Sequence, residues 1–279
     1  MKKISRRSFL AAAGLSVAAL ALTACGGSSA STASSVASSA ASSEAASTSA
    51  AAGELTTVEA GKLTMATNAT FPPYEMTTDA GTIEGIDVDT AQAIAEKLGL
   101  ELQIDDMDFD AALLSVQQGK ADIAMAGITV TDERMAVMSF SDSYATGIQS
   151  VIVPEGSDIA SVDDLAGKKI GTQRGTTGYL YCSDDFGEDA VVAYDNGLTA
   201  VQALNNGQVD AVVIDNAPAK EYVAANPGLA ILDTSYAEED YAIGLAKGSA
   251  LEDAVNAALE ELKADGTLQS IVDKYITAE

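Results

Sequence analysis

One pattern of helix, glycine, aspartate and strand occurs twice in this chain. LLSVQQGKADIAMAG (residues 113–127) and VQALNNGQVDAVVID (residues 201–215) each hold an apolar helical pattern, a glycine, an aspartate three residues later and an apolar run. Gly119 and Asp122 correspond to Gly207 and Asp210, which lie 88 residues further along the chain. This spacing is too long for a solenoid, whose repeats span about 20 to 50 residues. It predicts two similar lobes with a cleft between them.

Short β-rich runs alternate with helical patterns around this repeat. The strand candidates are KLTMAT, ELQI, ADIAMAG, KKIGT, VVAY and DAVVI. The clearest helical pattern is DVDTAQAIAEKLG, which begins with acidic residues and ends at Gly99. Such alternation favours an α/β fold. We therefore predict two lobes, each a mainly parallel sheet flanked by helices.

The N-terminal segment predicts export and a membrane anchor. A basic opening is followed by an uncharged apolar run over residues 9–22, which is too short to span a bilayer and is typical of a signal peptide, here residues 1–24. The ending LTAC resembles the lipidation site of bacterial lipoproteins, which implies a lipid on Cys25. SRRSFL resembles a twin-arginine signal except for Ala11, so the export route stays open. Residues 25–53 are almost entirely Ser, Ala, Thr and Gly and predict a disordered tether.

Composition excludes several kinds of chemistry from the body of the chain. There is no histidine, and Cys182 is the only cysteine beyond Cys25, so Ser-His or Cys-His nucleophiles and the usual zinc ligands are absent. The formal net charge of −26 becomes −30 without the four basic residues of the signal peptide. Nucleic acid and anionic lipid surfaces are therefore poor partners for the body. We predict no cofactor and no metal site.

Polar groups suited to a small zwitterion follow three of the predicted strands, where parallel sheets bind ligands. Arg134, one of two arginines beyond the signal peptide, offers bidentate donors for a carboxylate. An ordinary ion pair with Asp132 or Asp142 is the alternative. Thr176 and Thr177 begin a helix, where free N–H groups favour an anion. The same pair also fits an ordinary helix N-cap.

The opposite pole and the side chain of such a ligand have candidates as well. Asp215, with the Thr129 hydroxyl and the Gly127 carbonyl, offers acceptors for an ammonium group, although Asp215 also fits a helix or turn cap. Phe71 in TFPPYEM and Phe109 in DMDFDA offer two rings that could enclose a ligand side chain. Each ring could equally be a plug over the core.

These motifs, in their order, resemble the polar amino-acid-binding proteins of ABC importers, the family 3 extracellular solute-binding proteins. The resemblance runs over residues 62–275 and rests on TFPPYE, GIDVDTAQAIAEKLG, FDAALLSVQQGKADIAMAGITVTDER, FSDSY, KKIGTQRGTTG and DGTLQSIVDKY. It implies a two-lobed periplasmic-binding-protein-like fold of type II, joined by two hinge strands near residues 145–149 and 238–243. The implied boundaries are 54–147 for lobe 1, 148–240 for lobe 2 and 241–279 for the return to lobe 1.

The resemblance also implies ligand roles for individual residues. Arg134 corresponds to the carboxylate clamp, assisted by backbone N–H groups of Thr129 and Thr177. Asn68 stands where several members that bind basic amino acids carry an acid. This difference favours a neutral polar ligand, although Glu75 or Asp106 could reach a cation. The predicted ligand-binding residues are Asn68, Phe71, Phe109, Gly127, Thr129, Arg134, Gln173, Thr176, Thr177 and Asp215.

The implied function is capture of a polar L-amino acid, neutral or basic, outside the cell. The implied partners are a membrane permease and, through it, an ATPase, with the protein monomeric and lipid-anchored at the outer face of the cytoplasmic membrane. The main alternative is an enzyme on the same fold, similar to a cyclohexadienyl or arogenate dehydratase, with Glu75 or Asp215 as its general acid. A tethered sensor or adhesin is a third class. Cys182 is expected to be a buried apolar residue of a helix in lobe 2.

Overall fold

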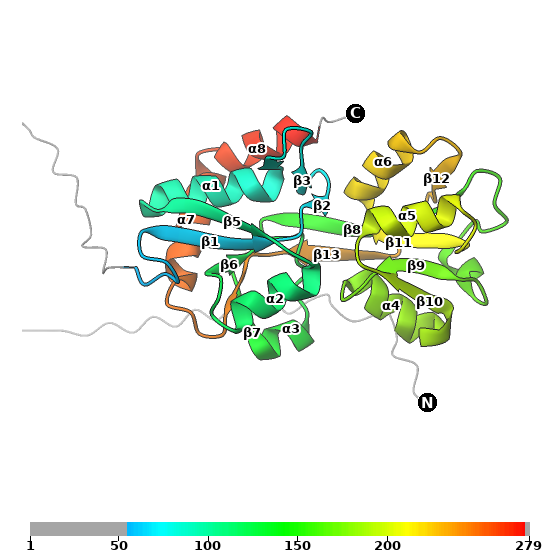
Figure 1. Cartoon of the computed structure of the whole chain (residues 1–279), viewed down its shortest axis with the longest axis horizontal. Helices are drawn as coiled ribbons and strands as arrows, with labels where there is room; N and C mark the ends of the chain where they lie inside the picture. The colour runs from blue at the N-terminus through cyan, green and yellow to red at the C-terminus, as the bar shows by residue number, and fades with distance from the viewer. Residues whose placement is uncertain (1–54, 277–279) are drawn as a thin grey trace, which may run out of the picture. The chain divides into compact units, whose positions relative to one another are not determined.

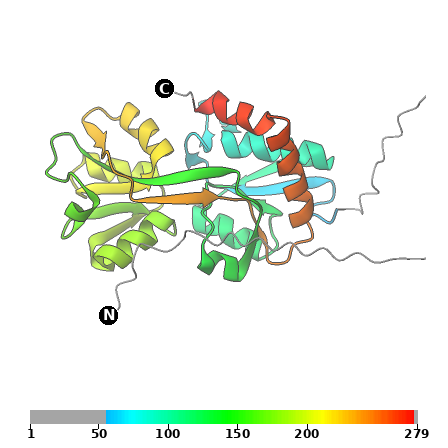
Figure 2. The ribbon, with the colours of Figure 1, turned by 180° about the vertical axis from the view of Figure 1, so that it is seen from behind.

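The computed structural model of the chain describes residues 55–276. The predicted signal peptide, the predicted lipidation at Cys25 and the tether at residues 25–53 lie outside this range. Within it the chain forms two α/β lobes, each around its own sheet (Figures 1 and 2).

Lobe 1 contains a five-stranded sheet with strand order β5-β1-β6-β14-β7. The strands are β5 (Glu101–Asp106), β1 (Lys62–Thr67), β6 (Ile123–Ala124), β14 (Gly244–Ala246) and β7 (Met138–Phe140). Strand β1 is parallel to β5 and β6, whereas β14 is antiparallel to β6 and β7. The last strand therefore brings the C-terminal part of the chain back into lobe 1.

Helices cover both faces of this sheet because side chains of a strand alternate between faces. Leu63 and Met65 of β1 join a core with α1 (Ile86–Leu98), α7 (Glu252–Ala264) and α8 (Thr267–Tyr275). Ala66, from the same strand, packs on the other side with α2 (Phe109–Gln117). The short helix α3 (Asp132–Val137) lies beside β7.

Lobe 2 contains a six-stranded sheet with the path β10-β9-β11-β8-β12, and β13 pairs with β8. The strands are β10 (Val191–Tyr194), β9 (Ile170–Gln173), β11 (Ala211–Asp215), β8 (Ala145–Pro154), β12 (Leu229–Ile231) and β13 (Ala237–Tyr241). Helices α5 (Gly197–Asn205) and α6 (Asn216–Ala225) pack on one face and α4 (Thr177–Phe186) on the other. The short 3-10 helices η1 (Val162–Leu165) and η2 (Glu188–Ala190) lie before β9 and β10. Cys182 is fully buried in the α4 core, as expected, and burial raises its pKa to about 12.

The two lobes are joined by β8 and β13, which are antiparallel partners over residues 145–149 and 237–241. Both strands run from one lobe to the other (Figure 2). The predicted hinge segments and lobe boundaries fall in or directly after this strand pair. A small third sheet, formed by β2 (Thr70–Phe71), β3 (Glu75–Thr77) and β4 (Ile83–Glu84), connects β1 to α1.

The repeated sequence unit forms the same structure in both lobes. Gly119 and Gly207 follow helices α2 and α5 with φ of 65° and 68°, a conformation that glycine adopts without steric cost. The Asp122 carboxylate accepts the N–H of Thr64 within β1, and Asp210 accepts the Lys169 N–H before β9, both at 2.8 Å. Each aspartate therefore joins the start of one strand to its parallel neighbour.

The two-lobed α/β prediction is confirmed, but the sheets are more mixed than expected. Each sheet has two parallel pairs on one side, and the rest are antiparallel. Alternation along the chain identifies the parallel pairs, whereas the antiparallel ones come from strands that return or cross between lobes. ADIAMAG forms a strand only at Ile123–Ala124, and Gly127 then turns the chain with φ of 55°.

Candidate ligand-binding site

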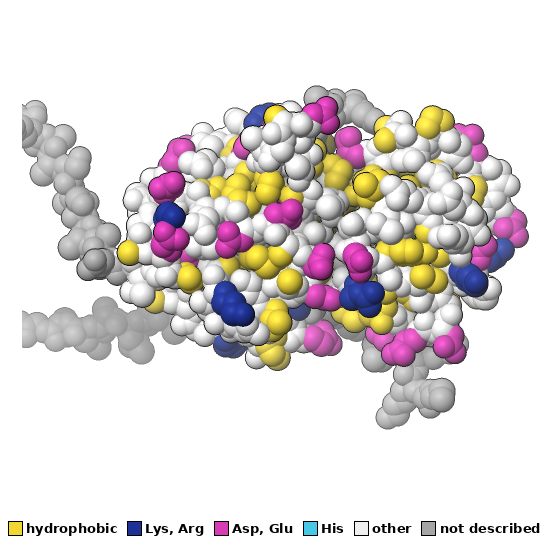
Figure 3. Space-filling view, viewed as in Figure 1, with side chains coloured by type: hydrophobic (Ala, Val, Ile, Leu, Met, Phe, Trp, Pro, Cys, Tyr) yellow, Lys and Arg dark blue, Asp and Glu magenta, His cyan; other side chains and the backbone are white. Residues whose placement is uncertain are grey.

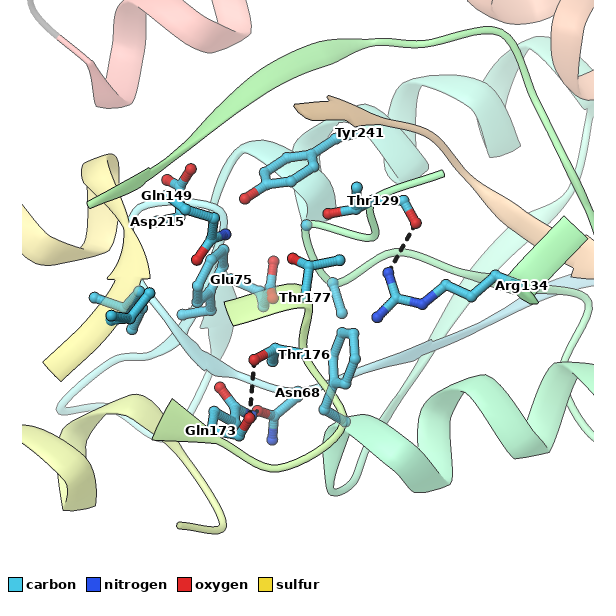
Figure 4. A pocket seen from close by; sticks show the side chains of 16 residues that line it. Asn68, Glu75, Thr129, Arg134, Gln149, Gln173, Thr176, Thr177, Asp215 and Tyr241 are labelled. Carbon is cyan, nitrogen blue, oxygen red and sulfur yellow. Dashed lines mark hydrogen bonds between the residues drawn. The ribbon is translucent and has the colours of Figure 1, made fainter. Parts of the chain in front are cut away.

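All ten predicted site residues line one pocket between the lobes (Figure 4). The pocket has about 460 Å³ of space between protein atoms, including its opening to solvent, a size typical of small-molecule sites. Its remaining lining residues are Glu75, Ala126, Gln149, Val213, Ile214 and Tyr241. Segments that are far apart in the sequence thus meet where strands of both sheets end.

Arg134 is a buried cation whose donors are only partly used. Thr131 caps α3 by accepting the Arg134 backbone N–H, and the Arg134 side chain lines the pocket. The guanidinium donates to the Thr129 carbonyl at 2.8 Å and to the Gly175 carbonyl at 3.1 Å. It also lies over the Phe109 ring, 5.4 Å from the centroid.

No carboxylate within residues 55–276 forms an ion pair with Arg134, so the alternative of a pair with Asp132 or Asp142 is wrong. The side chain is only 8% exposed, and burial lowers its pKa, an effect that the nearby Glu239 opposes. A guanidinium has five N–H donors, of which two are used here. The arrangement leaves a buried positive charge with free donors facing the pocket.

The loop before α4 contributes to the same end of the pocket. Thr176 is the N-cap of α4, and its hydroxyl accepts the Tyr179 N–H and donates to the Gln173 carbonyl. Its side chain therefore acts as the cap that the alternative interpretation predicted. Thr177 is buried and begins the helix, where first-turn N–H groups have no partner within the helix. These N–H groups favour an anion.

Asp215 supplies a negative charge from lobe 2. Its carboxylate accepts the Ile148 N–H at 2.7 Å and the Ala217 N–H at 2.9 Å, so it also caps α6. Burial raises its pKa to about 6, while these two N–H groups and the Tyr241 hydroxyl act in the opposite direction. Asp215 is therefore mostly ionised at pH 7, held by two backbone donors at the edge of the pocket.

Gly127 and Thr129, the two other predicted acceptors for a ligand ammonium, each donate a hydrogen bond to a buried acid. The Gly127 N–H donates to the Asp87 carboxylate at 3.0 Å, and a Cβ at Gly127 would lie 2.7 Å from the Phe71 ring. The Thr129 hydroxyl donates to Glu239 at 3.1 Å, which leaves its oxygen lone pairs available to another donor. Glu239 also accepts from the Gln149 amide at 2.9 Å.

The two predicted rings also serve the core. Phe109 is 6% exposed and belongs to the core beneath α2, so the plug interpretation is confirmed for that ring. Phe71 stacks on Tyr74 with ring centroids 5.7 Å apart, and it packs against the cores of both lobes. Both rings border the pocket as well.

Asn68 and Gln173 join the lobes directly. The Asn68 carbonyl oxygen accepts the Gln173 amide at 2.9 Å and the Thr70 hydroxyl at 3.0 Å, and its amide group donates to the Met107 carbonyl. The polar atoms of Asn68 are thus largely used by the protein. The Tyr222 hydroxyl of lobe 2 donates to the Thr70 carbonyl at 2.6 Å, next to this bridge.

Replacing Tyr222 with phenylalanine removes an inter-lobe hydrogen bond without touching the pocket. We expect every ligand to bind more weakly by about 0.5–1.5 kcal/mol, the usual net contribution of one hydrogen bond, because the lobes then hold together less well. Calorimetric titration with several ligands measures this. A change in the ratio of affinities for two ligands would show that Tyr222 affects selectivity instead.

Sequence reasoning missed three polar residues near the pocket: Gln149, Glu239 and Tyr241. They lie on the crossing strands β8 and β13, which the sequence indicates only as hinge segments. Alternation in AEEDY, with Glu239 and Tyr241 both buried, is the one signal that could have found two of them.

Two other charged residues lie outside the pocket lining. Asp106 accepts the Ala69 N–H at 2.8 Å. The Arg174 side chain is 58% exposed, and its guanidinium lies 3.8 Å from the Asp195 carboxylate. The surfaces of the two lobes meet on the face shown in Figure 3, where acidic and basic side chains are interspersed.

No helix among residues 55–276 has the length and apolar character to cross a bilayer. Within the same residues, no group of three or more His, Cys, Asp or Glu side chains is arranged to hold a metal ion.

A pocket between two α/β lobes, with a buried unpaired guanidinium from one and a carboxylate from the other, defines a solute-binding protein. The chain matches the bacterial extracellular solute-binding proteins, family 3, over residues 63–278, and it belongs to that family.

Particular relatives agree with this assignment. The chain is 33% identical over 276 residues to a probable histidine-binding protein of Neisseria gonorrhoeae, covering 96% of this chain and 95% of the relative. It is similar to the structure of an ancestral arginine-binding protein bound to arginine, with 42% identity, a TM-score of 0.74 and coverage of 77% of this chain and 98% of that one. The ancestral arginine-binding protein bound to glutamine gives 41% identity, a TM-score of 0.73 and coverage of 78% and 99%.

Proposed function

We propose that this chain captures a free polar L-amino acid outside the cell by closure of its two lobes and delivers it to the permease of an ABC importer. The observation that carries the proposal is the buried Arg134 guanidinium, which lacks a carboxylate partner within residues 55–276 and faces a pocket that also holds Asp215. An α-amino acid supplies the missing anion and a cation together. The names of the family and of the relatives support the same role.

Each part of the ligand has a group suited to it. The α-carboxylate would bind the free donors of Arg134 and the first N–H groups of α4, beginning at Thr177. The α-ammonium would donate to Asp215, the Thr129 hydroxyl and the Gly127 carbonyl. Because these groups belong to different lobes, the complete set exists only when the lobes are in contact. Ligand binding therefore favours closure, since it adds contacts in that state alone.

The test is calorimetric titration of the chain, without its predicted signal peptide, with all twenty amino acids plus ornithine and cystine. We expect one or a few polar amino acids to bind, and analogues that lack the α-carboxylate or the α-ammonium to fail. Equal binding of an analogue without the α-carboxylate would exclude Arg134 as the clamp.

The enzyme alternative has one supporting observation, the fully buried Glu75 in the pocket, whose raised pKa keeps it protonated and able to act as an acid. The named relatives are binding proteins, and we therefore infer a transport role without catalysis. Incubation with prephenate or arogenate, followed by product analysis, is expected to give no turnover.

We further propose that the protein is a monomer held at the outer face of the cytoplasmic membrane by a lipid on Cys25. The support is the sequence pattern around Cys25 and the tether that follows it.

Ligand affinity is expected to fall as the pH decreases through about 6, the pKa to which burial raises Asp215. Protonation of this carboxyl removes the charge that faces the ligand ammonium, so the apparent affinity should decrease by up to about tenfold per pH unit below that value. Titration of a neutral ligand between pH 5 and pH 7 measures this. A constant affinity over that range would show that Asp215 does not contact the ammonium.

The raised pKa of Asp215 also affects the stability of the ligand-free protein. Asp215 binds its proton more tightly in the folded chain than at its ordinary pKa of 3.8. Its contribution to stability is therefore present at pH values below 3.8 and is lost as the pH rises through about 6. Bound ligand opposes this loss, because its ammonium stabilises the ionised carboxylate.

A further inference from the structure

Glu75 is a buried acid that the amino-acid-binding groups described above leave unused. It lies on β3, has no exposed surface and is among the side chains that line the pocket (Figure 4). No N–H or O–H group within residues 55–276 donates to either of its carboxyl oxygens. A buried carboxylate without donors is strongly disfavoured, so the carboxyl group is stable there only as the acid or with a partner from outside the protein.

Asp87 lies beside Glu75 and has the opposite surroundings. Its carboxylate accepts the Tyr144 hydroxyl at 2.7 Å and the Gly127 N–H at 3.0 Å. Two acids in contact do not both ionise readily. Burial, repulsion by Asp87 and a proton that Glu75 shares with Asp87 hold the pKa of Glu75 well above its ordinary value, whereas the Gly127 N–H, the Tyr144 hydroxyl and the Glu75 proton limit the pKa of Asp87 to about 6. Glu75 therefore carries the proton at neutral pH and Asp87 the charge.

The other titratable groups around Glu75 are acids and phenols. Asp106 of β5 raises its pKa further, and Glu75 in turn acts on the phenols of Tyr74, Tyr144 and, from lobe 2, Tyr222. No lysine or arginine in residues 55–276 pairs with Glu75. The surroundings thus favour a cation at this position, and the protein itself provides none.

We propose that Glu75 receives the end of the ligand side chain and exchanges its own proton for a cationic one. When a guanidinium or ammonium group enters, the O–H bond of Glu75 breaks, the proton passes to solvent, and the carboxylate pairs with the cation. When a neutral amide enters, the carboxyl keeps its proton and turns it from Asp87 to the amide oxygen. The inference rests on the proposed function, because it requires an amino acid in the pocket.

This exchange explains how one pocket accommodates both ligand classes. A fixed buried carboxylate would reject a neutral side chain, since its charge would be left without a partner. A fixed neutral group would reject a cation. A protonated acid matches either, at the cost of one proton for the cation. Glu75 also supplies an acid for the end of the ligand side chain, although Asn68, which stands where several members carry an acid, is neutral.

Titration calorimetry at pH 7.5 tests the exchange directly. L-arginine and L-glutamine are titrated into the chain in buffers of different ionisation enthalpy, at a pH where Asp215, with a pKa of about 6, is already ionised. For arginine the measured enthalpy should vary with the buffer, with a slope close to one proton released. For glutamine it should not. Above pH 7, as long as Glu75 stays protonated in the free protein, the arginine affinity should rise by up to about tenfold per pH unit while the glutamine affinity stays constant.

The variant Glu75→Gln keeps the shape of the side chain and removes the exchangeable proton. We expect it to bind glutamine within a few fold of the original chain and arginine at least about 100-fold more weakly, the effect of removing one partner of a buried charge pair. Thermal unfolding of the variant checks that the fold is retained. In contrast, Asp106→Asn changes a nearby charge outside the pocket lining and should leave the arginine proton release in place.

The outcomes separate this inference from the proposed function. Arginine binding with a buffer-independent enthalpy, or unchanged arginine affinity in Glu75→Gln, would overturn the exchange. Binding of glutamine without binding of arginine would also overturn it and would leave the proposed function intact. If no amino acid binds the original chain, both fail.

Discussion

Replacing Arg134 with alanine is expected to weaken binding of every amino acid ligand by about 2–5 kcal/mol, as for removal of one partner of a buried charge pair. The guanidinium is 8% exposed, its free donors face the pocket, and no acid within residues 55–276 pairs with it. Its loss leaves the ligand carboxylate buried without a partner. Calorimetric titration of the variant with the preferred ligand measures the effect.

Arg174→Ala is the matched control, because it also removes one arginine but from an exposed position. We expect its affinity and stability to change by less than about 0.5 kcal/mol. Arg134→Lys keeps the charge but lacks the planar pair of donors, so it should recover only part of the affinity. Undiminished binding in Arg134→Ala would remove this residue from the site and with it the main support for the proposed function.

Replacing Gly85 with alanine is expected to destabilise the chain by at least about 3 kcal/mol, through a strained backbone and overpacking. Gly85 precedes α1 with φ of 142°, and an added Cβ would lie 2.1 Å from the Tyr74 carbonyl oxygen and 2.9 Å from the Glu75 Cα. These are backbone atoms, which cannot move aside as a flexible side chain can. Urea unfolding followed by circular dichroism gives the free energy of unfolding.

Gly81→Ala is the control for the backbone conformation alone. Gly81 lies in the turn before β4 with φ of 79°, and an added Cβ there meets no atom within 4 Å. Its substitution should cost only about 1–2 kcal/mol, the penalty of the left-handed conformation. Similar losses in the two variants would show that contact with the Tyr74 backbone is not what requires glycine at position 85.

Much of the site could be predicted because a parallel sheet places its ligand groups at the ends of its strands. Arg134, Thr177 and Asp215 follow three different strands in the sequence, and the fold brings them to one pocket. Local pattern also explains the helix caps. Thr176 and Asp215 cap α4 and α6. Capping depends only on neighbouring residues, and the sequence predicts it for both as the alternative to ligand binding.

The sequence could not reveal which groups satisfy one another across long distances. Asn68 accepts a hydrogen bond from Gln173, 105 residues away. Glu239 accepts hydrogen bonds from the Thr129 hydroxyl and the Gln149 amide. These pairings depend on the crossing of β8 and β13 and on the contact between lobes. They have no local signature, because a hydrogen bond constrains the positions of two groups in space and not their spacing along the chain.

Sequence alone determined the α/β class, the repeated unit in the two lobes, and the presence of one arginine and one aspartate suited to the poles of an amino acid. Hydrophobic periodicity, glycine positions and capping residues are local properties, which depend on neighbours along the chain. Only the tertiary structure decided that Arg134 is buried without an acidic partner, and that Glu75 rather than Asp87 lacks donors. Charge and protonation depend on burial and on the nearest groups in space, which the fold alone brings together.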